Sequence, residues 1–276
     1  MTPGEIVPLS FNGGLVALSF LVAVLGSYVA MLAAVGIRTE TRDGEIRIGY
    51  ILIGAVAMGG VGIWSMHFIG MQAQNLPFEV GYQLGLTVLS FLVAAGLSGW
   101  AFWFIGRERF TFFRCLAGGA AAGLGVVAMH YVGMSAMRMP AVLLWNLPMV
   151  VLSAFIAVIA ASAALWLAFN TQNERQRFGS AVLMALAICG MHYTGAAAGT
   201  VVCTAAREYA SLQIGGVMLP YIAFALSAAT MLLMRWHLQR ASRRFRARTA
   251  RRIDSIIESA PMASPGRLPG SAAGPG

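Results

Sequence analysis

Long apolar runs dominate the chain, and short polar segments separate them. Seven such runs cover residues 13–36, 50–72, 83–105, 115–137, 147–169, 179–201 and 215–236. A helix needs roughly 20 mostly apolar residues to cross a bilayer, and backbone groups in lipid must bond within their own segment. The pattern therefore predicts an all-α membrane protein with seven transmembrane helices, each antiparallel to the next.

The composition supports this assignment and removes one class of seven-helix protein. Hydrophobic residues make up 58% of the chain and charged residues only 11%, whereas soluble domains carry about 25% charged residues. The first run lacks a preceding basic segment and is too long for a signal peptide, so we expect a retained helix. All 19 basic residues are arginine, and without a lysine the helices cannot hold a retinal Schiff base.

The arginines are distributed unevenly between the two sides of the predicted bundle. Seventeen of the 19 fall in the first, third and fifth connections or at and beyond the end of the seventh run, and only Arg138 and Arg207 fall on the other side. Positively charged residues concentrate on the cytoplasmic side of membrane proteins. The distribution predicts that the N-terminus lies outside and the C-terminus lies in the cytoplasm.

The chain divides into four predicted segments. Residues 1–12 form a short outer segment, 13–236 the seven-helix domain, 237–259 an Arg-rich juxtamembrane cytoplasmic helix, and 260–276 a disordered tail rich in Pro, Gly, Ala and Ser. Basic residues beside a membrane bind anionic headgroups, so we assign this cluster to the lipid surface and not to a nucleic acid. The surface-binding residues are Arg240, Arg243, Arg244, Arg246, Arg248, Arg251 and Arg252.

A short phrase recurs three times near the C-terminal ends of the second, fourth and sixth runs. The copies are Met66-His67-Phe68, Met129-His130-Tyr131 and Met191-His192-Tyr193, with histidine spacings of 63 and 62 residues and a glycine three residues after each histidine. Ionisable side chains are costly in hydrocarbon and usually functional there. A two-helix repeat predicts that the three imidazoles lie at one depth in the outer leaflet and converge.

The acidic residues exclude several functions. All ten lie outside the cores of the apolar runs. Pumps and ion-coupled carriers usually need acids at mid-membrane, and hydrolytic sites need an acid or base beside the reacting group. We therefore expect that the chain is not an enzyme and that the histidines are the main reactive groups.

Sulfur atoms accompany the histidines at helical spacing. Met71 and Met134 follow His67 and His130 by four residues, and Cys189 precedes His192 by three, so each shares the face of its histidine. Imidazole with thioether or thiol is a soft ligand set that suits Cu(I) better than zinc. Haem is a weaker candidate because it needs a wide cleft and usually two axial ligands. A metal transporter and a bundle whose histidines only join helices remain open.

At these residues the chain resembles the MHYT-domain family of bacterial membrane sensors. Met191-His192-Tyr193-Thr194 matches the family signature verbatim, and Met129-His130-Tyr131-Val132 and Met66-His67-Phe68-Ile69 are looser copies. The resemblance covers about residues 10–236. It implies a seven-helix sensor domain in the bacterial inner (cytoplasmic) membrane.

The resemblance also implies a ligand and a site. Members are proposed to bind copper and through it to sense oxygen, carbon monoxide or nitric oxide. Carried over residue by residue, the metal ligands are Met66, His67, Met129, His130, Met191 and His192. Met71 and Met134 also fit the family pattern, and helical spacing adds Cys189 as a further candidate. Many relatives carry a cyclic-di-GMP enzyme after the last helix. We expect this chain either to signal through a separate cytoplasmic partner or to be part of a longer protein.

Overall fold

The computed structural model describes residues 2–41, 48–108, 110–205, 212–215 and 218–259. Its helices are long and mostly apolar, as the runs predict. They are α1 Gly13–Thr41, α2 Ile48–Ala55, the π-helix η1 Val56–Ser65, α3 Met66–Ala73, α4 Leu84–Gly106, α5 Phe112–Ser135, α6 Leu147–Asn170, α7 Glu174–Ala197 and α8 Met218–Ser259. The segments α2, η1 and α3 follow one another without a break and correspond to the second apolar run.

Six helices among the described residues are long and apolar enough to cross a membrane. They correspond to the first six predicted spans, and they make the chain a multi-pass membrane protein. The seventh run coincides with the beginning of α8, which continues through the Arg-rich segment to Ser259. The seventh span and the orientation of the termini stay predictions.

The chain separates into two compact units, residues 1–234 and residues 235–276. In the second unit α8 carries the basic cluster, of which the side chains of Arg240 and Arg251 are described and exposed, and Arg240 stacks over the Trp236 ring. The predicted disordered tail, 260–276, lies outside the described residues.

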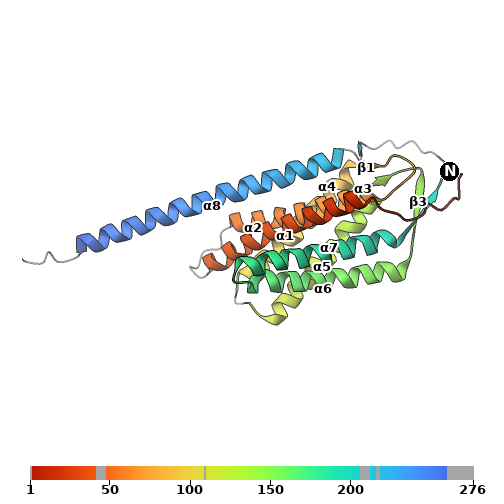
Figure 1. The fold of residues 1–276 in the computed structure, drawn as a ribbon. Helices are drawn as coiled ribbons and strands as arrows, with labels where there is room; N and C mark the ends of the chain where they lie inside the picture. The colour runs from red at the N-terminus through yellow and green to blue at the C-terminus, as the bar shows by residue number, and fades with distance from the viewer. Residues whose placement is uncertain (1, 42–47, 109, 206–211, 216–217, 260–276) are drawn as a thin grey trace, which may run out of the picture. The chain divides into compact units, whose positions relative to one another are not determined.

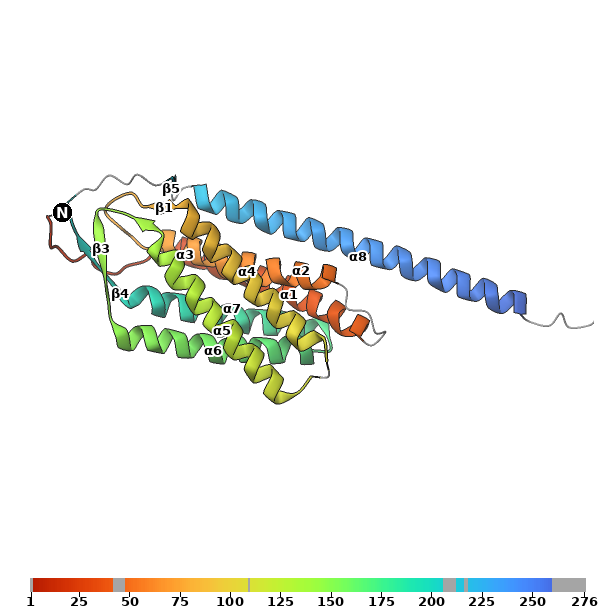
Figure 2. The same cartoon turned by 180° about the vertical axis from the view of Figure 1, so that it is seen from behind.

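The six spanning helices close into a ring in which each packs against the next along the chain and α7 packs against α1. Figures 1 and 2 show these helices lying alongside one another. The short helix α3 also contacts α5 and α7. Because α3, α5 and α7 carry the three histidines, this packing brings the repeated phrase to one place in the bundle.

Two small antiparallel sheets lie at the end of the bundle where α3, α5 and α7 end (Figure 1). One sheet has the order β2-β1-β5 and the other pairs β3 with β4. The strands are β1 Gly81–Gln83, β2 Met137–Arg138, β3 Ala141–Trp145, β4 Gly199–Cys203 and β5 Gln213–Gly215. The N-terminal segment pairs with β4 through a bridge from Ile6 to Val202, and a second bridge joins Phe11 to Gln74 at the end of α3.

These strands correct the all-α prediction, which holds for the spanning part alone. The sixth predicted run, 179–201, was also wrong at both ends. The helix begins earlier, at Glu174, where the Asn173 side chain accepts a hydrogen bond from the backbone N–H of Gln176 and caps it. It ends at Ala197, and the apolar residues that follow form β4. A short apolar run does not by itself distinguish a buried strand from a helix, which is why the pattern merged the two.

Candidate metal centre

The three histidines of the repeated phrase meet inside the bundle. His67 comes from α3, His130 from α5 and His192 from α7, and each is almost completely buried. The Nδ1 atom of His67 lies 3.1 Å from Nδ1 of His192 and 3.2 Å from Nδ1 of His130. Among the described residues, these three form the one group of His, Cys, Asp or Glu whose ligand atoms all lie within 4.8 Å of one another.

Ordinary hydrogen bonds do not satisfy this arrangement. In a neutral imidazole, Nδ1 carries either one N–H or one lone pair, so it forms one conventional hydrogen bond in the plane of the ring. Nδ1 of His67 faces two other Nδ1 atoms. Two nitrogens bound to one tetrahedral metal ion at about 2.0 Å lie about 3.3 Å apart, close to the spacing seen here. The triad therefore fits the donor geometry of a metal ion.

The glycine three residues after each histidine makes room for an imidazole from another copy. A Cβ atom on Gly133 would meet Nε2 of His67, one on Gly195 would meet Nε2 of His130, and one on Gly70 would meet Nε2 of His192. The three contacts run in a closed cycle around α3, α5 and α7. Each Nε2 atom therefore lies against a glycine of another copy, and the Nδ1 atoms are the ones that converge.

A second set of repeated contacts fixes the helices that carry the histidines. The seventh residue of α1, α4 and α6 is a buried serine, namely Ser19, Ser90 and Ser153. The Tyr193 hydroxyl lies 2.9 Å from Ser19 Oγ, and the Tyr131 hydroxyl lies 2.7 Å from Ser153 Oγ. Each tyrosine directly follows its histidine, so the bonds join α7 to α1 and α5 to α6 beside the site.

The first copy has Phe68 in place of the tyrosine and reaches its serine in another way. The indole N–H of Trp64 donates to Ser90 Oγ at 3.0 Å and lies 3.2 Å from the Thr87 carbonyl oxygen. Phe68 packs between the Trp64 and Tyr82 rings, with centroids 5.0 and 5.2 Å away. The same link between neighbouring helices is therefore made by a different side chain.

The first copy is also preceded by the π-helix η1, which has no counterpart in α5 or α7. Within it the Ser65 hydroxyl donates to the carbonyl oxygen of Gly60, five residues earlier, at 2.9 Å. Gly59 of η1 lies directly against α4, since a Cβ at this position would collide with the backbone of Ala94. π-Helical segments are rare and frequently lie at functional sites.

The sulfur-containing residues proposed as ligands lie in different parts of the bundle interior. Met66 and Cys189 belong to one small buried cluster with Ala23 and Ala185. Met129, Met71 and Met134 are buried in the main core, and Met191 lines an internal cavity. Cys189 lies outside the group of converging ligand atoms formed by the described residues. Of the predicted site residues, the structure brings together the three histidines.

Outside the membrane-spanning helices, Tyr82 in β1 covers the first copy from the strand side. It is buried and packs edge-on against Phe68. Burial raises its pKa above the usual value, and a hydrogen bond with Gln72 opposes part of that effect. The hydroxyl therefore stays protonated, and Tyr82 places an uncharged ring against Phe68 beside the first histidine.

Comparison with known proteins identifies the repeat. The MHYT family model, described as a bacterial signalling protein N-terminal repeat, matches residues 60–118 and 123–181. Both matched segments begin seven residues before a histidine of the triad. The chain belongs to the MHYT-domain family. The third copy, at Met191-His192-Tyr193-Thr194, follows the second matched segment.

Curated relatives of this MHYT protein are bacterial signalling proteins. The chain is 44% identical over 194 residues to the bifunctional diguanylate cyclase/cyclic di-GMP phosphodiesterase MucR of Pseudomonas aeruginosa. The aligned region covers 68% of this chain and 28% of MucR. The chain is 36% identical over 203 residues to the cyclic di-GMP phosphodiesterase NbdA of the same organism (68% and 24%), and 30% identical over 203 residues to the signaling protein YkoW of Bacillus subtilis (70% and 25%). No solved structure matches the chain.

The aligned segments show which part of these proteins the chain corresponds to. The chain spans about a quarter of the length of the curated relatives it matches, and the match is to their MHYT region. Membership of this family and the six spanning helices make it a multi-pass protein of the bacterial inner membrane with a role as a membrane sensor in signalling.

Proposed function

We propose that the chain is a sensor module that holds a copper ion at the histidine triad and binds a diatomic gas there. The observation that carries the proposal is the convergence of three buried Nδ1 atoms, one from each copy of the repeat. The expected gases are oxygen, carbon monoxide and nitric oxide. The three imidazoles would hold the ion, and a position left open on it would accept the gas.

The donor set favours Cu(I) over divalent metals. Three neutral imidazoles bring no negative charge, and no carboxylate joins the group of converging ligands formed by the described residues. A buried charge without a counter-charge is costly, so a monovalent ion is less costly here than a divalent one. Thioether sulfur adds to this preference because it is a soft, uncharged ligand. Met66, Met129 and Met191, with Met71, Met134 and Cys189, remain the proposed sulfur ligands.

The geometry disfavours haem at the same position. The centroids of the three imidazole rings lie 4.9, 5.0 and 5.2 Å apart. A porphyrin placed on any one of these histidines needs a wide cleft beside it, and the other two rings already occupy that space. A bundle in which the histidines only join helices is less favourable, because the shared Nδ1 contact leaves hydrogen-bonding groups unsatisfied.

We further propose that the sensor acts through a cytoplasmic signalling partner or an attached output domain. Two relatives are named as proteins that make or degrade cyclic di-GMP. In this chain the helix that follows the sensor is the Arg-rich part of α8, whose basic side chains would lie against anionic headgroups. A shift of the spanning helices on gas binding would reach the partner through this helix.

Elemental analysis of purified protein tests the proposal. The wild type should carry copper at a fixed ratio, and the triple variant His67→Ala, His130→Ala, His192→Ala should lose it. His237→Ala removes the one remaining histidine, which lies in the Arg-rich unit, and should retain copper. Equal copper in the wild type and the triple variant would refute the proposal.

The sulfur ligands need a separate measurement. Replacement of Met66, Met129 and Met191 by leucine keeps the apolar volume and removes the thioether. X-ray absorption at the copper edge of the loaded protein should show a sulfur scatterer in the wild type and fewer or none in the variant. A sulfur scatterer that persists unchanged in the variant would assign the sulfur to Met71, Met134 or Cys189, and a wild type without one would restrict the site to nitrogen ligands.

A further inference from the structure

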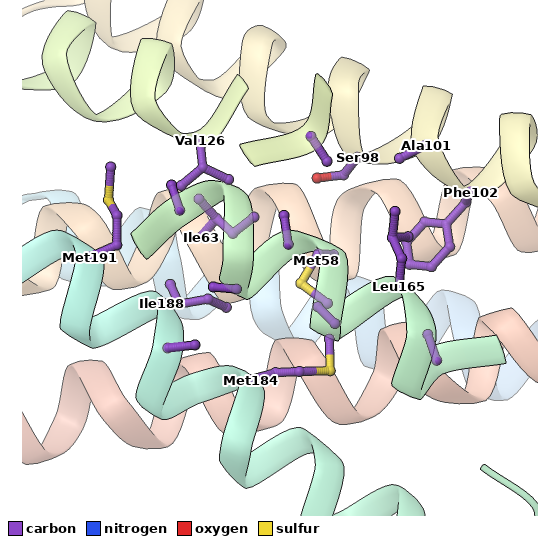
Figure 3. A pocket seen from close by; sticks show the side chains of 17 residues that line it. Met58, Ile63, Ser98, Ala101, Phe102, Val126, Leu165, Met184, Ile188 and Met191 are labelled. Atoms are coloured by element: carbon purple, nitrogen blue, oxygen red, sulfur yellow. The ribbon is translucent and has the colours of Figure 1, made fainter. Parts of the chain in front are cut away.

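A cavity of about 70 Å³ lies inside the bundle, between η1, α4, α5, α6 and α7. Alanines and other apolar side chains form its wall, and Ser98 supplies the one hydroxyl among the residues that line it. Figure 3 shows Met191 at one end of this space and Phe102 and Leu165 towards the other. Met191 directly precedes His192, so one end of the cavity adjoins the metal centre.

The repeat places the cavity directly beneath the histidines. Ile63, Val126 and Ile188 all line it, and each precedes its histidine by four residues. Four residues are about one turn of an α-helix, so each lies on the face that carries the imidazole, one turn deeper. The three converging helices thus supply a ring of branched apolar side chains below the triad.

A second ring continues the cavity deeper into the bundle. Ala122 and Met184 line it and precede their histidines by eight residues, whereas Met58 precedes His67 by nine. The π-helix accounts for the difference, because a π-helical segment accommodates one more residue than an α-helix over the same stretch. The cavity therefore follows the common axis of the three copies for two turns.

The chemistry of the wall defines what the cavity can hold. An apolar cavity of this kind stays dry, because a water molecule inside it would lack two to four polar partners. The transfer of a small neutral apolar molecule from water into such a space is favourable in free energy, and the bilayer around the bundle already concentrates such molecules. A diatomic gas fits the volume, whereas an ion or a polar metabolite would be desolvated without compensation.

We propose that this cavity is a binding site for diatomic gas that supplies the metal centre from the membrane interior. The gas would collect between the two rings and pass Ile63, Val126 and Ile188 to reach the triad. The supply step rests on the proposed copper site, but the binding of a small apolar molecule in the cavity does not. The two claims can therefore be tested apart.

Xenon is the probe for the cavity itself, because it is apolar, monatomic and indifferent to the metal. Purified full-length protein in detergent should show a saturable xenon signal by ¹²⁹Xe NMR, with or without copper. Ala161→Leu adds three carbons to the wall and should abolish that signal, while Ala163→Leu, at an exposed position of the same helix, should leave it unchanged. Ala187→Leu fills the cavity from α7 and serves if the first variant does not fold.

The supply step is measured by carbon monoxide binding to copper-loaded protein after flash photolysis. Ala161→Leu should retain copper and slow the rebinding at least tenfold, while Ala163→Leu should rebind at the wild-type rate. Unchanged rebinding in Ala161→Leu, or no saturable xenon in the wild type, would overturn the inference. Xenon binding in a protein that takes up neither copper nor carbon monoxide would instead overturn the proposed function and leave the cavity site standing.

Discussion

The first histidine-bearing span and its two counterparts place the imidazole in the same way but differ in what surrounds it. In α5 and α7 a regular helix leads to the histidine, and a tyrosine hydroxyl reaches a serine on the next helix. In the first span a π-helix precedes the histidine, and Trp64 makes the bond to serine in place of Phe68. In all three copies the histidine ring and the ring that follows it have centroids 4.8 Å apart.

This comparison shows which features of the repeat are interchangeable. The link to the neighbouring serine tolerates a change of donor, and the lower cavity ring tolerates an inserted residue. The glycine after the histidine is present in every copy, because each one faces the Nε2 atom of another copy's imidazole. The most uniform contact is therefore expected to be the least replaceable.

The largest effect is expected from replacing those glycines. Gly70→Ala, Gly133→Ala and Gly195→Ala each place a methyl group in the space occupied by another copy's imidazole. The overpacking costs about 1–3 kcal/mol. It should also displace one Nδ1 atom from the centre. All three should lose most of the bound copper, as measured by elemental analysis. Gly190→Ala, at an α7 position with open space around it, is the matched control and should retain copper. A normal copper content in Gly133→Ala would contradict the cyclic contact.

A smaller effect is expected when the first copy is made to look like the others. Phe68→Tyr adds a hydroxyl at a fully buried position whose serine partner is already bound by Trp64. A buried hydroxyl without a partner costs about 1–3 kcal/mol, so the thermal unfolding midpoint in detergent should fall. In the double variant with Trp64→Phe the serine is released, and part of that loss should be recovered. Strictly additive losses would show that the two donors do not share the serine.

The smallest effect is expected from deleting the donors of the other copies. Tyr131→Phe and Tyr193→Phe each remove one hydrogen bond to a serine, which contributes about 1 kcal/mol. Thermal unfolding should show similar small losses for both, with copper retained. Tyr221→Phe, at an exposed position of α8, should change nothing and serves as the reference. Unequal losses would mean that the two copies are less alike than their geometry indicates.

The sequence was sufficient for six of the seven predicted spans and for the meeting of the histidines. Apolar runs of bilayer length are strong signals, and one phrase repeated on alternate helices predicts that its members lie together. The strands at the end of the bundle where α3, α5 and α7 end were missed because they are two to five residues long and continue the apolar composition of the helices before them. Serine at the same place in three helices was visible in the sequence, but its partners are set by packing between helices.

The π-helix and the cavity could not be predicted from the sequence, for a different reason. The offset of one residue between Met58 and its counterparts appears only when the three copies are aligned on their histidines and the lining residues are known. The branched residues four before each histidine could have been recognised from the repeat alone. That they surround an empty space could not, because volume depends on how side chains from five segments fill the interior.

The closed cycle of glycine contacts has a mechanical consequence. Each imidazole rests on the backbone of the following copy, and the last rests on the first, so no helix of the three can slide or rotate without pushing another ring. The three contacts couple α3, α5 and α7, so a small displacement of one helix would be transmitted to the other two. A displacement of one imidazole would therefore press on the backbone of the next copy, so all three spans would respond to a disturbance at the centre.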